Sequence, residues 1–226
     1  MNLFAIRKHL DKVLYPFVSN IAKLPIHANQ WTLIGGFVGV ACSIMFLYGK
    51  WWPGLVLLLT RGLIDNIDGF CARNKNQRST FGAVMDDITD RWVLGIIYAG
   101  ACVNLSNDFP HVLIVLGFGI TGSLANVIAK LSIYAESQQD IFRAEGKLGH
   151  PIDLVGLFGS AEFLIYFGMG ALWTAILEDQ RPLLAGVWAV AIMSHLSLFQ
   201  RIFFAWQRYR HVDPAALFAE QEAQNS

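Results

Sequence analysis

Long apolar runs separated by short polar stretches dominate the pattern of this chain. A helix needs about 20 mostly apolar residues to cross the hydrocarbon core of a bilayer. Five runs approach or exceed that length, and a sixth, shorter run continues directly into charged residues. We predict membrane-spanning helices at residues 32–48, 51–63, 81–105, 110–129, 154–177 and 182–200. The predicted fold class is therefore an all-α integral membrane protein with six transmembrane helices.

The first 24 residues have a different pattern, in which apolar residues recur at helical spacing between charged ones. In the first twenty residues the charged positions are Arg7, Lys8, Asp11 and Lys12, which interrupt the unbroken apolar stretch that a cleavable signal would need. The pattern predicts an amphipathic helix over 1–24. Such a helix lies in the membrane interface or packs on the rest of the protein, and the pattern fits both placements.

Composition supports a membrane protein, because 54% of the 226 residues are hydrophobic and only 15% are charged. A soluble domain carries roughly 25% charged residues. The formal net charge is +0, which gives no overall field to recruit nucleic acid, so we expect no nucleic-acid partner. Cys42, Cys71 and Cys102 lie in or beside apolar runs without paired spacing, so we expect small buried side chains rather than disulfides or a zinc site.

Basic residues predict the orientation in the membrane. They concentrate before the first span, between the second and third, between the fourth and fifth, and after the sixth, whereas the opposite connections hold only Lys50 and Arg181. The positive-inside rule then places both termini, and the loop between the second and third spans, on the cytoplasmic side of an inner or plasma membrane. We expect one domain over 1–212, with the spans in 25–205 and a polar tail over 213–226.

Four carboxylates flank the connection between the second and third spans. Asp65 and Asp68 are three residues apart, and Asp86 and Asp90 are four apart, so each pair projects from one face of its own helix. The connecting segment is short and polar, which predicts an antiparallel helical hairpin. Both pairs then lie at a similar depth and can converge.

Four converging carboxylates near a membrane boundary require compensation by positive charge. Hard divalent cations prefer oxygen ligands, and a pair of them suits chemistry at phosphorus. Gly69 and Gly82 leave space beside the acids for a diphosphate, and Arg73 can hold phosphate oxygens in bidentate fashion. The alternative is a solvated network in which the acids pair with nearby basic residues, namely Arg61, Arg73, Lys75, Arg78 and Arg91.

These residues also carry a resemblance to a known family. The positions are Asp65, Asp68, Gly69, Ala72, Arg73, Gly82, Asp86 and Asp90. Their types and spacing resemble the signature of the CDP-alcohol phosphotransferase (CDP-alcohol phosphatidyltransferase) family, class I, without gap or substitution. The resemblance implies transfer of a substituted phosphoryl group, such as phosphatidyl, from a lipid-linked CDP donor such as CDP-diacylglycerol to a small alcohol, with release of CMP, in phospholipid biosynthesis.

The resemblance also implies roles for the signature residues. Its four aspartates would bind two Mg²⁺ or Mn²⁺ ions, and Asp90 would act as the general base. The CDP site would comprise Asp65, Gly69, Ala72, Arg73 and Gly82. Asn29 and Thr32 resemble a further family element before the first span, although Ala28 replaces its proline. A homodimer in contact with membrane lipids is implied as well.

The acceptor is predicted from a departure from the family pattern. Relatives with phosphorylated acceptors present extra arginines near the end of the fourth span and the start of the fifth. Here acidic residues dilute the first region, where Arg143, Lys147 and His150 are the basic candidates, and Glu162 stands without flanking arginines. We therefore expect a neutral or cationic alcohol rather than a phosphate monoester. Glu162 has a simpler interpretation as a partner of Lys130 or Arg201.

Two other classes of protein also use intramembrane carboxylates. An intramembrane prenyltransferase binds a magnesium-diphosphate substrate, but its acidic motifs lie on distant helices rather than on one hairpin. A cation transporter needs buried carboxylates as well, but not Arg73 and two glycines at these spacings.

Overall fold

The computed structural model describes residues 18–21, 24–75, 77–136, 152 and 155–210, and this part of the chain contains no strand. Its long helices are α2 (Ala28–Leu47), α3 (Trp51–Asn74), α4 (Thr80–Leu105), α5 (Val112–Glu136), α7 (Ser160–Leu177) and α8 (Arg181–Tyr209). The predicted all-α class is confirmed.

Local sequence accounts for where several helices begin. The side chain of His27 caps α2 by accepting a hydrogen bond from the backbone N–H of Asn29. The side chain of Gln30 in turn accepts a hydrogen bond from the backbone N–H of His27. Ser79 caps α4 by accepting from the backbone N–H of Gly82 at 2.9 Å. Pro182 lies in the first turn of α8, where its missing N–H costs nothing.

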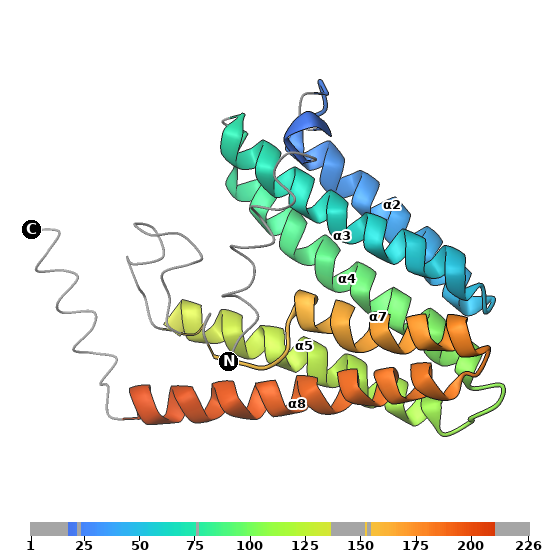
Figure 1. Cartoon of the computed structure of the whole chain (residues 1–226). Helices are drawn as coiled ribbons and strands as arrows, with labels where there is room; N and C mark the ends of the chain where they lie inside the picture. Colours follow the sequence, from blue (N-terminus) through green and yellow to red (C-terminus); the bar gives the residue numbers. More distant parts are fainter. Residues whose placement is uncertain (1–17, 22–23, 76, 137–151, 153–154, 211–226) are drawn as a thin grey trace, which may run out of the picture.

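The helices form two groups (Figure 1). In the first group α2 packs along both α3 and α4, and in the second group α8 packs along both α5 and α7. The groups meet where α3 touches α7 and α4 touches α5. Short turns join α2 to α3, α4 to α5 and α7 to α8 at one end of the bundle, and the polar end of the α3–α4 hairpin lies at the opposite end.

Close backbone contact holds α7 and α8 together. A Cβ at Gly186 would lie 2.7 Å from the carbonyl oxygen of Tyr166, and one at Gly170 would lie 2.8 Å from that of Pro182. Small residues permit this approach, as is common between helices in membranes. A larger buried core then joins the groups, with Phe46 of α2 against Phe167 of α7 at its centre.

Within the described residues, four helices are long and apolar enough to cross a membrane: α2, residues 112–135 of α5, α7 and α8. Large apolar side chains on their surfaces, such as Phe37 and Ile114, are strongly exposed. These features are those of a membrane protein. The other two helices, α3 and α4, have 24 and 26 residues but carry the charges of the hairpin, which lower their apolar character.

Several predicted boundaries need correction. The fifth apolar segment was expected from residue 154, but α7 begins at Ser160, because Gly156 has φ +114° and Gly159 is extended. The helical conformation of α3 continues past residue 63 to Asn74, through the charged residues. Of the amphipathic helix predicted over 1–24, residues 18–21 are helical, whereas most of that segment and the tail over 213–226 lie outside the described residues.

Candidate active site

Three of the four predicted metal ligands converge in the structure. Asp65 and Asp68 from α3 and Asp86 from α4 each offer a carboxylate oxygen, and these oxygens lie within 4.8 Å of one another. A set of carboxylate oxygens at this spacing fits a hard divalent cation such as Mg²⁺ or Mn²⁺. The predicted hairpin thus brings residues from both sides of the connection to one point.

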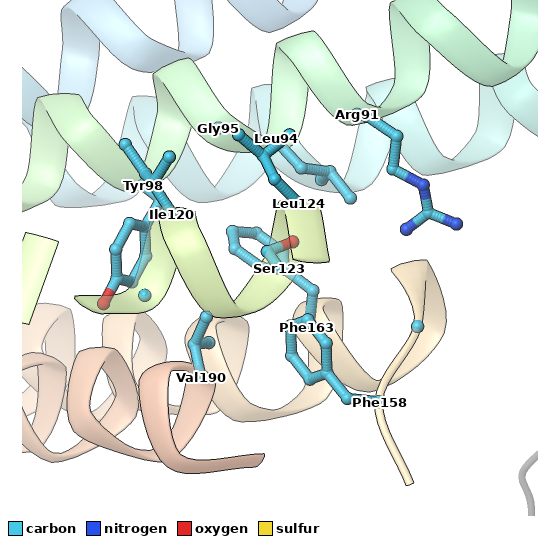
Figure 2. Close-up of a pocket in the computed structure, with 12 residues that line it drawn as sticks. Arg91, Leu94, Gly95, Tyr98, Ile120, Ser123, Leu124, Phe158, Phe163 and Val190 are labelled. Carbon is cyan, nitrogen blue, oxygen red and sulfur yellow. The ribbon is translucent and has the colours of Figure 1, made fainter. Parts of the chain in front are cut away.

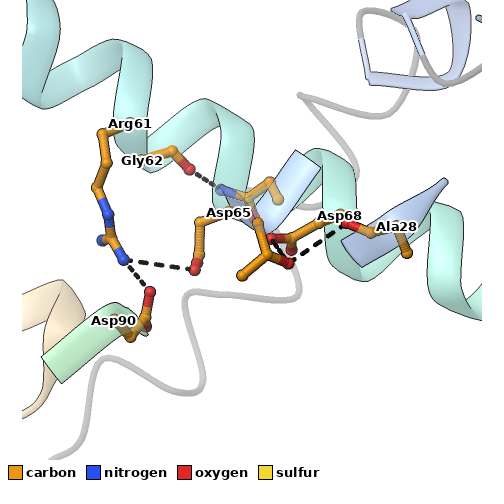
Figure 3. Close-up of polar contacts among 8 residues, drawn as sticks. Ala28, Arg61, Gly62, Asp65, Asp68 and Asp90 are labelled. Atoms are coloured by element: carbon orange, nitrogen blue, oxygen red, sulfur yellow. Dashed lines mark hydrogen bonds and ion pairs between the residues drawn. The ribbon is translucent and has the colours of Figure 1, made fainter. Parts of the chain in front are cut away.

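Asp68 is the most buried member of this group, with 7% of its surface exposed. The hydroxyl of Thr32 donates to its Oδ2 at 3.0 Å and also to the carbonyl oxygen of Ala28 (Figure 3). Asp68 lies beyond the apolar segment 51–63, in the polar end of α3. Burial, followed by the charges of Asp86 and Asp65, raises the pKa of its carboxyl to about 8. A bound cation would relieve this repulsion.

Asp90, the predicted base, has a different neighbour. The guanidinium of Arg61 donates to Asp90 Oδ1 and lies 3.8 Å from Asp65 Oδ1, as Figure 3 shows. Arg61 is only 4% exposed, so a buried cation joins α3 to α4 beside the carboxylate group. Away from water such a charge needs partners that compensate it, and here two carboxylates do so.

The two signature glycines make room for polar side chains. A Cβ at Gly69 would lie 3.2 Å from Nη1 of Arg73, so the arginine folds back over the glycine. A Cβ at Gly82 would lie 2.7 Å from Oδ1 of Asn29. Gly82 therefore permits Asn29 to approach the start of α4. Ala72, the remaining CDP candidate, is partly buried on α3.

Polar contacts also fix the start of α2 against the α3–α4 connection. The backbone N–H of Ala28 donates to Oε1 of Gln77 at 2.9 Å, and Nζ of Lys75 donates to the carbonyl oxygen of Leu24 at 2.8 Å. These bonds explain how Asn29 and Thr32, distant in sequence from the aspartates, come to lie beside them.

A pocket lies between α4, α5, α7 and α8 (Figure 2). Arg91, the residue after Asp90, lies at one end of it, and Tyr98 lies at the other. Apolar side chains including Phe158 and Phe163 form most of the lining. The pocket is thus mainly apolar, with Arg91 as the charged residue among the described residues that line it.

Beside this pocket, a network of hydrogen bonds fixes the segment before α7. Arg201 of α8 donates from Nη1 to the carbonyl oxygen of Asn126 at 2.7 Å and from Nε to that of Val155 at 3.3 Å. The side chain of Asn126 donates to the carbonyl oxygen of Phe158. Glu162 in the first turn of α7 is buried. The predicted acceptor residues Arg143, Lys147 and His150 lie outside the described residues.

The sequence pattern did not predict the role of Arg61. It named Arg61 only as one of several basic residues that could pair with the four aspartates. A signal was available, because Arg61 is the lone charge within the apolar run 51–63 and stands one helical turn before Asp65. An ionisable residue in such a run marks a functional site with a nearby partner.

The comparison with known families decides the assignment. Residues 25–193 match the model of the family described as CDP-alcohol phosphatidyltransferase. This chain belongs to the CDP-alcohol phosphatidyltransferase family. The match covers most of the described helices and the whole aspartate hairpin, and it sets aside the prenyltransferase and transporter alternatives.

Individual relatives are distant but cover almost the full length. The chain is 27% identical over 199 residues to the archaetidylinositol phosphate synthase of Methanothermobacter thermautotrophicus, covering 88% of this chain and 93% of the relative. It is 25% identical over 237 residues to the phosphatidylinositol phosphate synthase of Streptomyces avermitilis, covering 100% of this chain and 90% of that protein.

Solved structures share the fold. The phosphatidylinositol phosphate synthase of Mycobacterium tuberculosis with CDP-DAG bound has a TM-score of 0.70 at 23% identity, covering 89% of this chain and 98% of that one. The same enzyme in complex with manganese and citrate has a TM-score of 0.70 at 24% identity, covering 88% and 91% of the two chains.

Proposed function

We propose that this protein transfers a phosphatidyl group from a CDP-linked lipid, such as CDP-diacylglycerol, to an alcohol and releases CMP, as a step of phospholipid biosynthesis. The observation that carries the proposal is the convergence of Asp65, Asp68 and Asp86 at the polar end of the α3–α4 hairpin. The family signature occupies the same hairpin, and Arg91, which follows Asp90 in the chain, lines a pocket between α4, α5, α7 and α8.

The donor is assigned to the face of the hairpin that carries the glycines. Two divalent ions, Mg²⁺ or Mn²⁺, held by Asp65, Asp68, Asp86 and Asp90 would supply neutralisation of the charge that develops around phosphorus. Arg73 binds diphosphate oxygens where Gly69 lets its guanidinium fold back. Gly82, with Asn29 against it, and Ala72 complete the proposed CDP site, and Thr32 orients Asp68.

Asp90 is the proposed general base. Its carboxylate takes the proton of the acceptor hydroxyl while the alcohol oxygen forms its bond to the phosphorus that carries the lipid. The bond between that phosphorus and the CMP oxygen breaks, and CMP leaves with the electron pair. Arg91 follows Asp90 in the chain and lies at the pocket, so the acceptor would approach from there.

The proposed membrane arrangement has six spans in one domain over 1–212, with α3 and α4 crossing alongside the four apolar helices. Their charges lie toward one end, so the remaining part of each helix is apolar. We place this polar end and both termini on the cytoplasmic side, because basic residues concentrate there. A homodimer completes the proposal.

The acceptor we propose is an alcohol without a phosphate. The pocket is lined mainly by apolar groups, and the buried carboxylate of Glu162 adds negative charge beside Gly159 in its wall. A phosphate would need several charge-assisted donors there, whereas Arg91 is the single charged residue among the described residues that line the pocket, and Arg201 already donates to two backbone carbonyls. A phosphorylated acceptor is the second candidate, because the relatives named above are synthases of inositol phosphate lipids.

The test is CMP release by the purified full-length protein, with CDP-diacylglycerol and Mn²⁺ or Mg²⁺, against a panel of acceptors. The panel comprises serine, ethanolamine, choline, glycerol and inositol, together with glycerol phosphate and inositol phosphate. We expect saturable release with one unphosphorylated alcohol. Saturable release with either phosphate ester would reassign the acceptor, and no release with any acceptor would overturn the proposed reaction.

A further inference from the structure

Arg61 occupies a position that the proposed chemistry does not explain. It is one of the most buried charged side chains among the described residues, and its guanidinium lies between carboxylates of two helices. Both partners, Asp65 and Asp90, belong to the proposed metal site. The guanidinium brings to these carboxylates a positive charge of the kind that a divalent ion would also bring.

The contacts of Arg61 divide the four aspartates unequally. Asp65, Asp68 and Asp86 offer oxygens within 4.8 Å of one another, a spacing suited to a first ion. Asp90 lies on the other side of Asp65, and the guanidinium bridges these two. A second ion bound by Asp90 and shared through Asp65 would need oxygens that Arg61 now contacts.

Two cations cannot use these oxygens at once. Mg²⁺ requires oxygen ligands at about 2.0–2.1 Å in near-octahedral geometry, which leaves no space for a guanidinium on the same side of the carboxylate. Their positive charges also repel at short range. A second ion can therefore enter only when Arg61 releases Asp90.

We propose that Arg61 is a positioning residue and a built-in competitor for the second divalent ion, an inference that rests on the proposed metal-dependent function. The first ion binds among Asp65, Asp68 and Asp86 without displacing it. The second ion binds more weakly, because it must displace the Arg61 guanidinium. In the absence of that ion, Arg61 holds Asp90 in place and offsets repulsion within the aspartate group.

The test is a titration with Mn²⁺, followed by the EPR signal of free and bound Mn²⁺, on the purified full-length protein. We expect two binding steps in the unaltered protein. Arg61→Gln should tighten the second step by about tenfold or more, because it removes a contacting positive charge, and should leave the first within about threefold. Arg61→Lys keeps the charge and should retain the wide separation between the steps.

Two further variants serve as a control and as an independent test of the second Mn²⁺ site. Arg181→Gln removes an exposed arginine at the opposite end of the bundle and should leave both steps unchanged. Asp90→Asn should abolish the second step and spare the first, which tests the assignment even if Arg61→Gln does not fold. Equal affinity of both steps in the unaltered protein, or no tightening in folded Arg61→Gln, would overturn the role of Arg61.

Failure of this inference differs from failure of the proposed function. CMP release from CDP-diacylglycerol, measured on the same preparations, tests the function alone. If CMP is released but Arg61→Gln leaves the affinity of the second Mn²⁺-binding step unchanged, Arg61 does not compete with the second ion. The expected Mn²⁺ pattern without CMP release would uphold Arg61 and refute the reaction.

Discussion

The two helix groups differ in where they tolerate charge. In the group of α5, α7 and α8, every helix passes the length and hydropathy requirement for a span, and the buried Arg201 donates to backbone carbonyls. In the group of α2, α3 and α4, only α2 passes, and the buried Arg61 pairs with carboxylates. The first arrangement fixes a segment of backbone, and the second places opposite charges next to one another at a candidate active site.

This difference teaches that hydropathy becomes least informative where the chemistry lies. Each charge needed at the site lowers the apolar signal of the helix that carries it. Arg61 and the Thr32 hydroxyl compensate these carboxylates for the lost water, and the proposed cations would do so further. The hairpin packs mainly along α2, and the apolar group touches it through α7 and α5.

The strongest test of the comparison is removal of the most buried carboxylate. Asp68→Asn should lower the rate of CMP release by about a thousandfold or more, because even changes to outer-shell partners of a metal cost about 10–100-fold. Asp87→Asn is the matched control: Asp87 is exposed and lies outside the signature. The rate of CMP release by Asp87→Asn should stay within about threefold of that of the unaltered protein. An equal loss in both variants would mean that total negative charge, rather than the position of Asp68, controls the rate.

The second prediction separates two roles within the polar group. Asp90→Asn should reduce kcat by about a hundredfold, through loss of the base and of the second ion, and largely spare the KM for the CDP donor, which the other three aspartates and Arg73 still bind. Arg73→Lys should instead raise that KM by about tenfold through loss of bidentate contact. Steady-state kinetics at saturating metal measures kcat and the donor KM for each variant. The division of roles is wrong if both variants change kcat and KM in the same way.

The third prediction concerns the apolar group, where we expect effects on stability. Gly186→Ala should lower the free energy of unfolding by about 1–3 kcal/mol, because its Cβ would press on the backbone of α7. Gly117→Ala on α5 adds a Cβ with nothing within 4 Å and should leave the melting temperature unchanged or slightly higher. Thermal unfolding in detergent compares the two, and an equal drop in both would count against the close α7–α8 contact.

The smallest expected effect concerns the hydroxyl that links α2 to the site. Thr32→Val keeps the shape of the side chain but removes the bond to Asp68, so the Mn²⁺ concentration for half-maximal activity should rise by about fivefold. Thr32→Ser retains the hydroxyl and should restore most of the affinity. If Val and Ser behave alike, this hydrogen bond does not contribute to metal binding.

Much of this arrangement follows from sequence pattern. Helical spacing placed Asp65 and Asp68 on one face of a helix, and a short polar connection predicted the hairpin that brings Asp86 to them. Apolar length predicted where most helices lie. These features depend on local periodicity, which a single sequence contains.

Other features depend on contacts between distant segments. The start of α7 is set by Gly156 and Gly159, and the contacts of its preceding segment with Arg201 come from another helix. The pairing of Arg61 with Asp90 likewise depends on how α3 and α4 each pack along α2, and periodicity says only that Arg61 and Asp65 share a face. Whether four or six helices cross the membrane depends on how charges are compensated in three dimensions.

The burial of the cysteines has a practical consequence for chemical labelling. Cys42, Cys71 and Cys102 are free thiols with none of their surface exposed, and they are all the cysteines of the chain. A membrane-impermeant maleimide should therefore react poorly with the folded protein. A single cysteine introduced at an exposed turn, such as residue 107 or residue 179, then reports which side of the membrane that turn faces without first replacing the native thiols.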